Sequence, residues 1–205
     1  MWIDIAYFEI AQGFKKVSVW IYFIIFFALA FLIANVLGGA FSGASIVIGN
    51  QATNVNSPLL IATLQIIFTI FGILICAAIF GNAGYQDYVT NMHPLIFTKP
   101  IKASNYFVGR FCGSFILSLF IQLGITLGLA IGFLMPFLDQ DALGAFRIGA
   151  YIQPVLVMVI PNIFLVGSIL FTLAILFRRM LPTYLASVIL LFGYLTSSNL
   201  TGDIE

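Results

Sequence analysis

The chain has 205 residues, of which 62% are hydrophobic and only 7% are charged, and its formal net charge is +1. Soluble domains carry about 25% charged residues, so this sequence lacks the charge needed to cover a water-exposed surface. The composition excludes an ordinary soluble fold and predicts an all-α, polytopic membrane protein. A net charge this close to zero does not indicate a nucleic-acid partner.

The first 16 residues predict a short amphipathic helix. Its apolar residues recur at spacings of four, three and four, which places them on one helical face: Ile3, Tyr7, Ile10 and Phe14. Lys15 and Lys16 close the segment. We expect residues 1–16 to lie along the membrane interface, in contact with membrane lipid. The alternative is a frayed N-terminal extension of the first membrane span.

Five apolar runs follow, and we interpret each as a membrane span: residues 17–36, 58–80, 106–135, 148–177 and 181–196. The third run holds about 30 residues, which at 1.5 Å per residue is too long for an upright span, so it must tilt or project beyond the bilayer. Pro161 lies inside the fourth run and predicts a kink or break there. Residues 197–205 are expected to form a polar tail.

Five glycines on the third span predict close helix packing. They repeat every four residues in two groups, which are Gly109 and Gly113, then Gly124, Gly128 and Gly132. Such a stripe lets a neighbouring helix approach backbone to backbone. We assign these glycines to helix packing and to no chemistry.

Residues 81–105, between the second and third spans, belong to the one long interruption of the apolar sequence that is rich in charge, hydrogen-bonding groups and proline. Gly81 and Gly84 predict a turn at its start, and Lys99 and Lys102 lie near its end. Arg110 falls about one turn inside the next span, where its side chain can reach lipid headgroups. If the chain passes a force to a cytosolic protein, we expect this segment to do so.

The positive charges predict the orientation of the chain. When the loops are assigned alternately to the two sides, one side receives seven Lys and Arg residues and the other receives only Arg147. The positive-inside rule then places the N-terminus and residues 81–105 in the cytoplasm and the tail, residues 197–205, outside. We expect an integral protein of a bacterial inner membrane.

The sequence contains no recognisable constellation for catalysis. Every charged residue lies in a loop or at the end of a span, which is unusual for an ion-coupled transporter. Cys76 and Cys112 form no CxxC pair, and His93, the single histidine, cannot complete a zinc site with them. There is neither an HExxH motif nor a GxxxxGK[ST] phosphate loop. We therefore expect no catalytic, cofactor or metal site in this chain, and no enzyme.

Four short motifs carry a resemblance to a known family: FEIAQGFKK before the first span, FGNAGYQDY after the second, TKPIKASNYFVGR before the third and IPNIFL in the fourth. Over essentially its whole length the chain resembles the membrane domain of ABC-2 type transporter permeases. The resemblance implies export driven by a separate ABC ATPase subunit, which binds the ATP and magnesium, and a second permease half. It also implies a sixth span beyond Glu205. Many family members place Arg before the acidic residue, where this chain has Gln86 and Asp87.

The same resemblance implies a coupling helix within Tyr88–Phe97 that docks on the ATPase. The candidate contacts are its apolar face and the polar residues beside it, namely Tyr85, Asp87, Tyr88, Met92, His93 and Leu95. Asp87 is equally well explained as a solvated carboxylate or a helix cap, and His93 is favoured as an interfacial contact over a ligand.

Two other functions compete with the permease hypothesis. The first is a non-transporting membrane anchor or scaffold of a larger multidomain protein. A membrane enzyme ranks third, because it would need catalytic residues beyond Glu205. An ATPase reading frame next to the gene would favour the permease.

Overall fold

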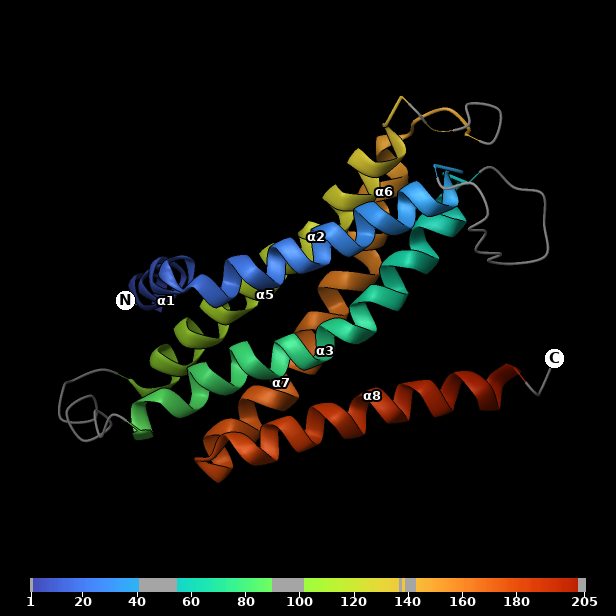
Figure 1. The fold of residues 1–205 in the computed structure, drawn as a ribbon. Coiled ribbons are helices and arrows are strands. Elements are labelled where there is room, and N and C mark those ends of the chain that lie inside the picture. Colours follow the sequence, from blue (N-terminus) through green and yellow to red (C-terminus); the bar gives the residue numbers. More distant parts are fainter. Residues whose placement is uncertain (1, 41–54, 90–101, 137, 139–142, 203–205) are drawn as a thin grey trace. The chain divides into compact units, whose positions relative to one another are not determined.

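The computed structural model describes residues 2–40, 55–89, 102–136, 138 and 143–202, and at Asp87 and residues 197–202 it describes the backbone only. All regular structure in this part of the chain is helical (Figure 1). The helices in order are α1 (Trp2–Lys15), α2 (Val17–Leu37), α3 (Pro58–Val89), α5 (Ala103–Phe133), α6 (Ile148–Pro154), the π-helix η1 (Val155–Val159), α7 (Ile160–Phe177) and α8 (Met180–Gly202). The predicted all-α, polytopic fold is confirmed.

Four helical segments are long and apolar enough to cross a membrane: Val17–Leu37, Pro58–Gln86, Ala103–Phe133 and Ile148–Phe177. The fifth expected span falls in α8, whose apolar part, Met180–Thr196, is shorter. The chain is therefore an integral membrane protein with four to five helices of spanning length.

The N-terminal segment is a helix of its own and not an extension of the first span, because α1 ends at Lys15 and α2 begins at Val17. The side of α1 that packs against protein carries the small residues Ala6 and Gly13. Two members of the predicted apolar face point away from the protein, with Ile3 59% and Tyr7 73% exposed. This exposure is what a helix in contact with lipid requires, and the interfacial position of α1 stays a prediction.

The segment predicted as the central loop is shorter than expected at both ends. The turn expected at Gly81–Gly84 is wrong, because α3 continues through both glycines to Val89, and α5 already begins at Ala103. A Cβ added at Gly81 would lie 3.2 Å from Thr183, and one added at Gly84 would lie 2.8 Å from Ala174. These glycines therefore serve close helix packing rather than a turn. Between the two helices only Lys102 is described.

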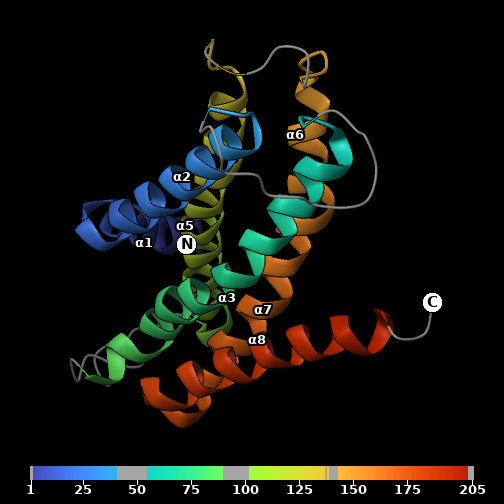
Figure 2. The same ribbon diagram turned by 45° about the vertical axis from the view of Figure 1, so that its right-hand side comes forward.

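The predicted polar tail is also partly helical, because α8 extends to Gly202 and not only to Thr196. Residues 197–202 contain no proline, and extending an existing helix costs far less than starting one. In Figures 1 and 2 the chain reverses direction between α7 and α8.

The kink or break expected near Pro161 appears as a local change of register within a continuous helical segment, because the π-helix η1 lies just before that residue. A proline ring clashes with the carbonyl four residues earlier, here that of Val157. The wider π-helical register relieves this crowding, and the Ile160 N–H donates to the Val155 carbonyl, five residues back.

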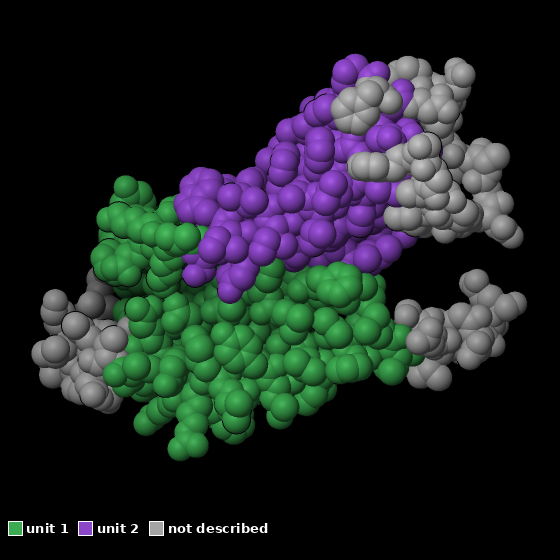
Figure 3. Space-filling view, viewed as in Figure 1, with its two compact units in different colours: residues 1–17, 70–119, 162–205 green, residues 18–69, 120–161 purple. Residues whose placement is uncertain are grey.

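The structure divides into two compact units, coloured separately in Figure 3. Unit 1 contains residues 1–17, 70–119 and 162–205, and unit 2 contains residues 18–69 and 120–161. Unit 1 thus holds α1, the C-terminal part of α3, the N-terminal part of α5, nearly all of α7 and α8. Unit 2 holds α2, α6, η1 and the remaining parts of α3 and α5.

Candidate functional site

Arg110 is the centre of a polar cluster in unit 1 that joins three helices. Its guanidinium lies 3.4 Å from the Glu9 carboxylate on α1 and donates a 3.0 Å hydrogen bond to the Ala83 carbonyl on α3. A further hydrogen bond of 2.9 Å runs from Arg110 Nε to the Tyr106 hydroxyl, one turn earlier on α5. The side chains of Arg110 and Glu9 are only 13% and 12% exposed. We call Glu9, Ala83, Tyr106 and Arg110 the Arg110 cluster.

Two of the predicted packing glycines bring α1 and α5 together at this cluster. A Cβ added at Gly109 would lie 2.7 Å from the Trp2 carbonyl oxygen, and one added at Gly113 would lie 2.6 Å from the Glu9 Cβ. Only glycine permits this approach, which places the Glu9 carboxylate beside Arg110. The other three, Gly124, Gly128 and Gly132, lie against α2 in unit 2.

A second arginine contacts the C-terminal end of α3. Arg178 lies in the short connection between α7 and α8, and its guanidinium carbon is 5.0 Å from the centroid of the Tyr88 ring. Among the described residues it is the one non-glycine residue with positive φ, at 51°. Its N–H donates to the Ala174 carbonyl at 3.1 Å and so closes the last turn of α7.

Beneath these polar contacts the end of α3 packs tightly on α7 and α5. A Cβ added at Gly167 on α7 would run into the Phe80 ring of α3, so the ring occupies the space that the glycine leaves. The Phe111 ring on α5 lies 5.3 Å from Phe80 and 5.7 Å from Phe171, between ring centroids. Apolar packing at Phe80 thus joins α3 to α5 and α7 ahead of its last turns, and the two arginines contact α3 nearer its C-terminal end.

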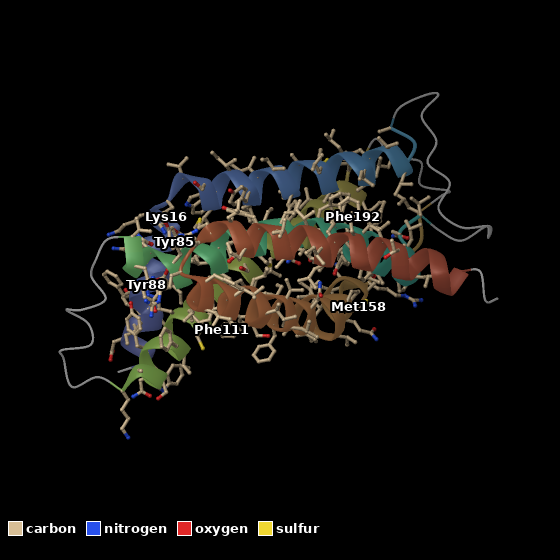
Figure 4. The ribbon with its side chains drawn as sticks, turned by 90° about the horizontal axis from the view of Figure 1, so that it is seen from below. Lys16, Tyr85, Tyr88, Phe111, Met158 and Phe192 are labelled. Atoms are coloured by element: carbon tan, nitrogen blue, oxygen red, sulfur yellow. The ribbon has the colours of Figure 1, made fainter. Side chains whose placement is uncertain are left out.

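Of the six residues predicted to contact a partner, the structure describes two in full. Tyr85 and Tyr88 are half-buried on the last turns of α3, and Figure 4 shows them at the same end of unit 1 as Lys16, with Phe192 at the other end. Asp87 lies on α3 by its backbone. The remaining three, Met92, His93 and Leu95, lie outside the described residues.

The sequence did not single out the partners of the two arginines. Arg110 was expected to reach lipid headgroups, and its guanidinium is instead bonded within unit 1. The spacing of four between Tyr106 and Arg110 was a signal that could have predicted their contact. Nothing in the sequence indicates that Glu9 lies beside Arg110 or that Tyr88 lies beside Arg178, because each contact joins helices that are distant in the chain.

The contacts in this region hold helices of unit 1 to one another. They are an ion pair, two hydrogen bonds from a guanidinium, and the faces of two tyrosine rings, Tyr106 at 5.5 Å from Arg110 and Tyr88 at 5.0 Å from Arg178. Within the described parts of the chain, no group of three or more His, Cys, Asp and Glu residues could hold a metal ion. The arrangement can hold helices in register and transmit a displacement between them.

Comparison of the sequence with models of known protein families and with characterised proteins gave no match.

Proposed function

We propose that the chain is the membrane permease component of an ABC-2 type transporter, driven by ATP hydrolysis in a partner subunit. One observation carries the proposal beyond the sequence resemblance. The last turns of α3, directly before residues 90–101, are tied to α1 and α5 by Arg110 and to the α7–α8 connection by Arg178. A displacement of this end of α3 would therefore move four other helices of unit 1.

The proposed sequence of events starts at the segment that follows Val89. A partner ATPase that docks on Tyr85, Tyr88 and the residues beyond them would push or pull on α3. The helix is continuous from Val89 back to Pro58, so it can carry that displacement along its axis without bending at Gly81 or Gly84. A second permease half would complete the path for the substrate.

The orientation of the chain is part of this proposal. The ATPase is cytosolic, so the end of α3 must face the cytoplasm, as the charge distribution predicts. We expect an impermeant thiol reagent, applied to intact cells after replacement of Cys76 and Cys112, to label Asp141→Cys and not Lys102→Cys. Labelling of position 102 alone would show that the orientation is opposite to the predicted one. The proposed docking segment would then lie outside the cell, where a cytosolic ATPase cannot reach it.

The decisive experiment first identifies an ABC ATPase reading frame beside the gene, and then measures co-purification and ATP turnover with that ATPase for the double variant Tyr88→Ala, Met92→Ala. Loss of the two apolar side chains should abolish partner binding and substrate-stimulated turnover, because a few aromatic and apolar anchors dominate such interfaces. Tyr88→Phe with Met92→Leu is the matched control, since it keeps the ring and the apolar volume.

Tyr88 also contacts Arg178, so thermal unfolding of each variant must be measured alongside. A well-folded double variant that still binds the ATPase and supports full turnover would refute the docking role. That outcome would favour the membrane scaffold.

A further inference from the structure

We propose that Arg178 is a positioning residue that holds the C-terminal end of α3 in a fixed orientation on the α7–α8 connection through the ring of Tyr88. The contact between Arg178 and Tyr88 does not depend on what the protein does. Its role in coupling to an ATPase rests on the function proposed above. Arg179, the next residue, provides the comparison, since it carries the same charge and is also exposed.

The backbone at Arg178 is the first argument. Its φ of 51° lies in the left-handed region, which is unfavourable for a residue with a Cβ. This position follows the last residue of α7, Phe177, and glycine is the residue that helix ends prefer there. The backbone alone would therefore be better served by glycine, so the reason for an arginine must lie in its side chain.

The side-chain geometry is the second argument. The guanidinium carbon lies 5.0 Å from the Tyr88 centroid, within the distance at which a cation is attracted to the face of an aromatic ring. Arginine suits this contact better than lysine because its planar group stacks on the ring. Tyr88 is half-buried and lies one residue before the end of α3, so the contact acts on the last turn of that helix.

The glycine contacts between α3 and α7 show which part of the packing does not depend on Arg178. Gly84 lies against Ala174, which sets the spacing between α3 and α7 one turn before Tyr88. That packing fixes how close the helices lie at Gly84, but it does not by itself set the rotation of the last turn, where helix ends fray. A contact at Tyr88 restricts those movements, and it lies on the path from the proposed docking segment to α7 and α8.

The first test measures the order of the last turn in the full-length chain without a partner. A spin label is attached at Val89→Cys, a position that is 54% exposed, after replacement of Cys76 and Cys112 by alanine, in phosphatidylcholine nanodiscs. Arg178→Gly should raise the ratio of mobile to immobile label about two- to fivefold, the change expected when a cation–π contact at an exposed site is lost. Arg178→Lys should lie between, and Tyr88→Phe should resemble the wild type because the ring remains.

Arg179→Gly is the matched control and should leave the spectrum unchanged. Arg178→Gly should not lower the melting temperature, because glycine relieves the left-handed backbone, and this separates loss of the contact from loss of the fold. Equal effects of the two glycine variants would assign the order to charge at a lipid surface and overturn the proposal. An unchanged spectrum in Arg178→Gly would overturn it as well.

The second test adds the ATPase. Arg178→Gly should keep partner binding and lose about two- to fivefold of the stimulated ATP turnover, whereas Arg179→Gly should keep both. Full turnover in Arg178→Gly, together with a mobile last turn, would refute the positioning role and leave the permease function intact. If the wild-type chain does not bind the ATPase, the proposed function fails, and the spin-label measurement still decides whether Arg178 orders α3.

Discussion

The two units of this protein hold their helices by different means. Six of the seven described Lys and Arg residues belong to unit 1, and the seventh, Arg147, belongs to unit 2. Two of the six, Arg110 and Arg178, contact the end of α3, one by an ion pair and hydrogen bonds and the other through an aromatic ring. Unit 1 therefore carries directional, charged contacts at one end of its helices.

Unit 2 relies on close backbone approach, aromatic stacking and neutral hydrogen bonds. Gly128 lies against the Phe27 carbonyl, and the Phe23 and Phe120 rings stack with centroids 4.7 Å apart. A side-chain amide joins two of its helices, because Gln65 Nε2 donates to the Tyr151 carbonyl at 3.3 Å. Contacts of this kind suit a framework in lipid, where a charge would be costly, whereas the charged contacts of unit 1 are consistent with the coupling role proposed above.

The largest effect should come from overpacking unit 2 at Gly128. A valine there would collide with the Phe27 carbonyl and the Ala30 Cβ, the latter at 2.9 Å from an added Cβ, and backbone cannot move aside as a side chain can. We expect Gly128→Val to destabilise the chain by about 3 kcal/mol, at the upper end for overpacking. Gly149→Val is the control within the same unit, since an added Cβ there meets nothing within 4 Å.

Thermal unfolding in detergent measures both glycine variants. A melting temperature for Gly128→Val equal to that of Gly149→Val would mean that α2 and α5 do not pack through glycine, and the description of unit 2 would be wrong.

A smaller effect should follow from removing the charge at the centre of unit 1. Arg110→Met removes an ionic partner of Glu9 and the donor to the Ala83 carbonyl, in a place where both charged side chains are mostly buried. We expect a loss of about 2 kcal/mol, less than for a fully buried pair because both side chains keep some exposure. When Arg110→Met is already present, Glu9→Gln should lower the free energy of unfolding only slightly further. The double-mutant cycle should therefore give a coupling energy of about 1 kcal/mol between the two side chains.

The control for this cycle is Arg147→Met, an exposed arginine of unit 2 whose loss should change stability by less than about 0.5 kcal/mol. Strictly additive effects of Glu9→Gln and Arg110→Met would show that the ion pair contributes nothing to stability. The two units would then differ only in how many charged residues each contains.

The helices themselves could be predicted because lipid leaves few alternatives. A run such as 17–36 must satisfy its backbone hydrogen bonds internally, so its apolar length alone predicted α2 almost to the residue. The spacing of the five α5 glycines likewise identified the residues that lie against neighbouring helices, although not which neighbours.

The errors arose where a residue has two uses. Gly81 and Gly84 indicate a turn in isolation, and only the positions of Thr183 and Ala174 show that they serve packing within a continuous helix. The pairing of Glu9 with Arg110 spans about a hundred residues of chain, and no local pattern reports a contact of that separation. The sequence therefore predicted the segments of the candidate site better than its contacts.

The smallest effect is expected from a change at Gln65, which tests the hydrogen bond between α3 and α6 in unit 2. Pro154 has no N–H to donate, and the Val155 N–H bonds to the Ile152 carbonyl, three residues back, so the Tyr151 carbonyl is left for the Gln65 amide. Gln65→Leu removes that bond, but it also removes the buried Gln65 Oε1, which has no hydrogen-bond partner among the described residues. The two changes oppose each other, so we expect destabilisation of no more than about 1 kcal/mol.

Infrared spectroscopy with carbonyl-labelled tyrosine tests this reasoning independently of stability. The Tyr151 carbonyl should shift to higher frequency in Gln65→Leu, because it loses its donor in an apolar surrounding. Thr63→Val is the control, since its exposed hydroxyl donates only to Leu59 on its own helix and its loss should leave the tyrosine carbonyl bands unchanged. An unshifted band in Gln65→Leu would mean that the Tyr151 carbonyl does not depend on Gln65 for its hydrogen bond. Pro154 would then perturb α6 without any help from α3.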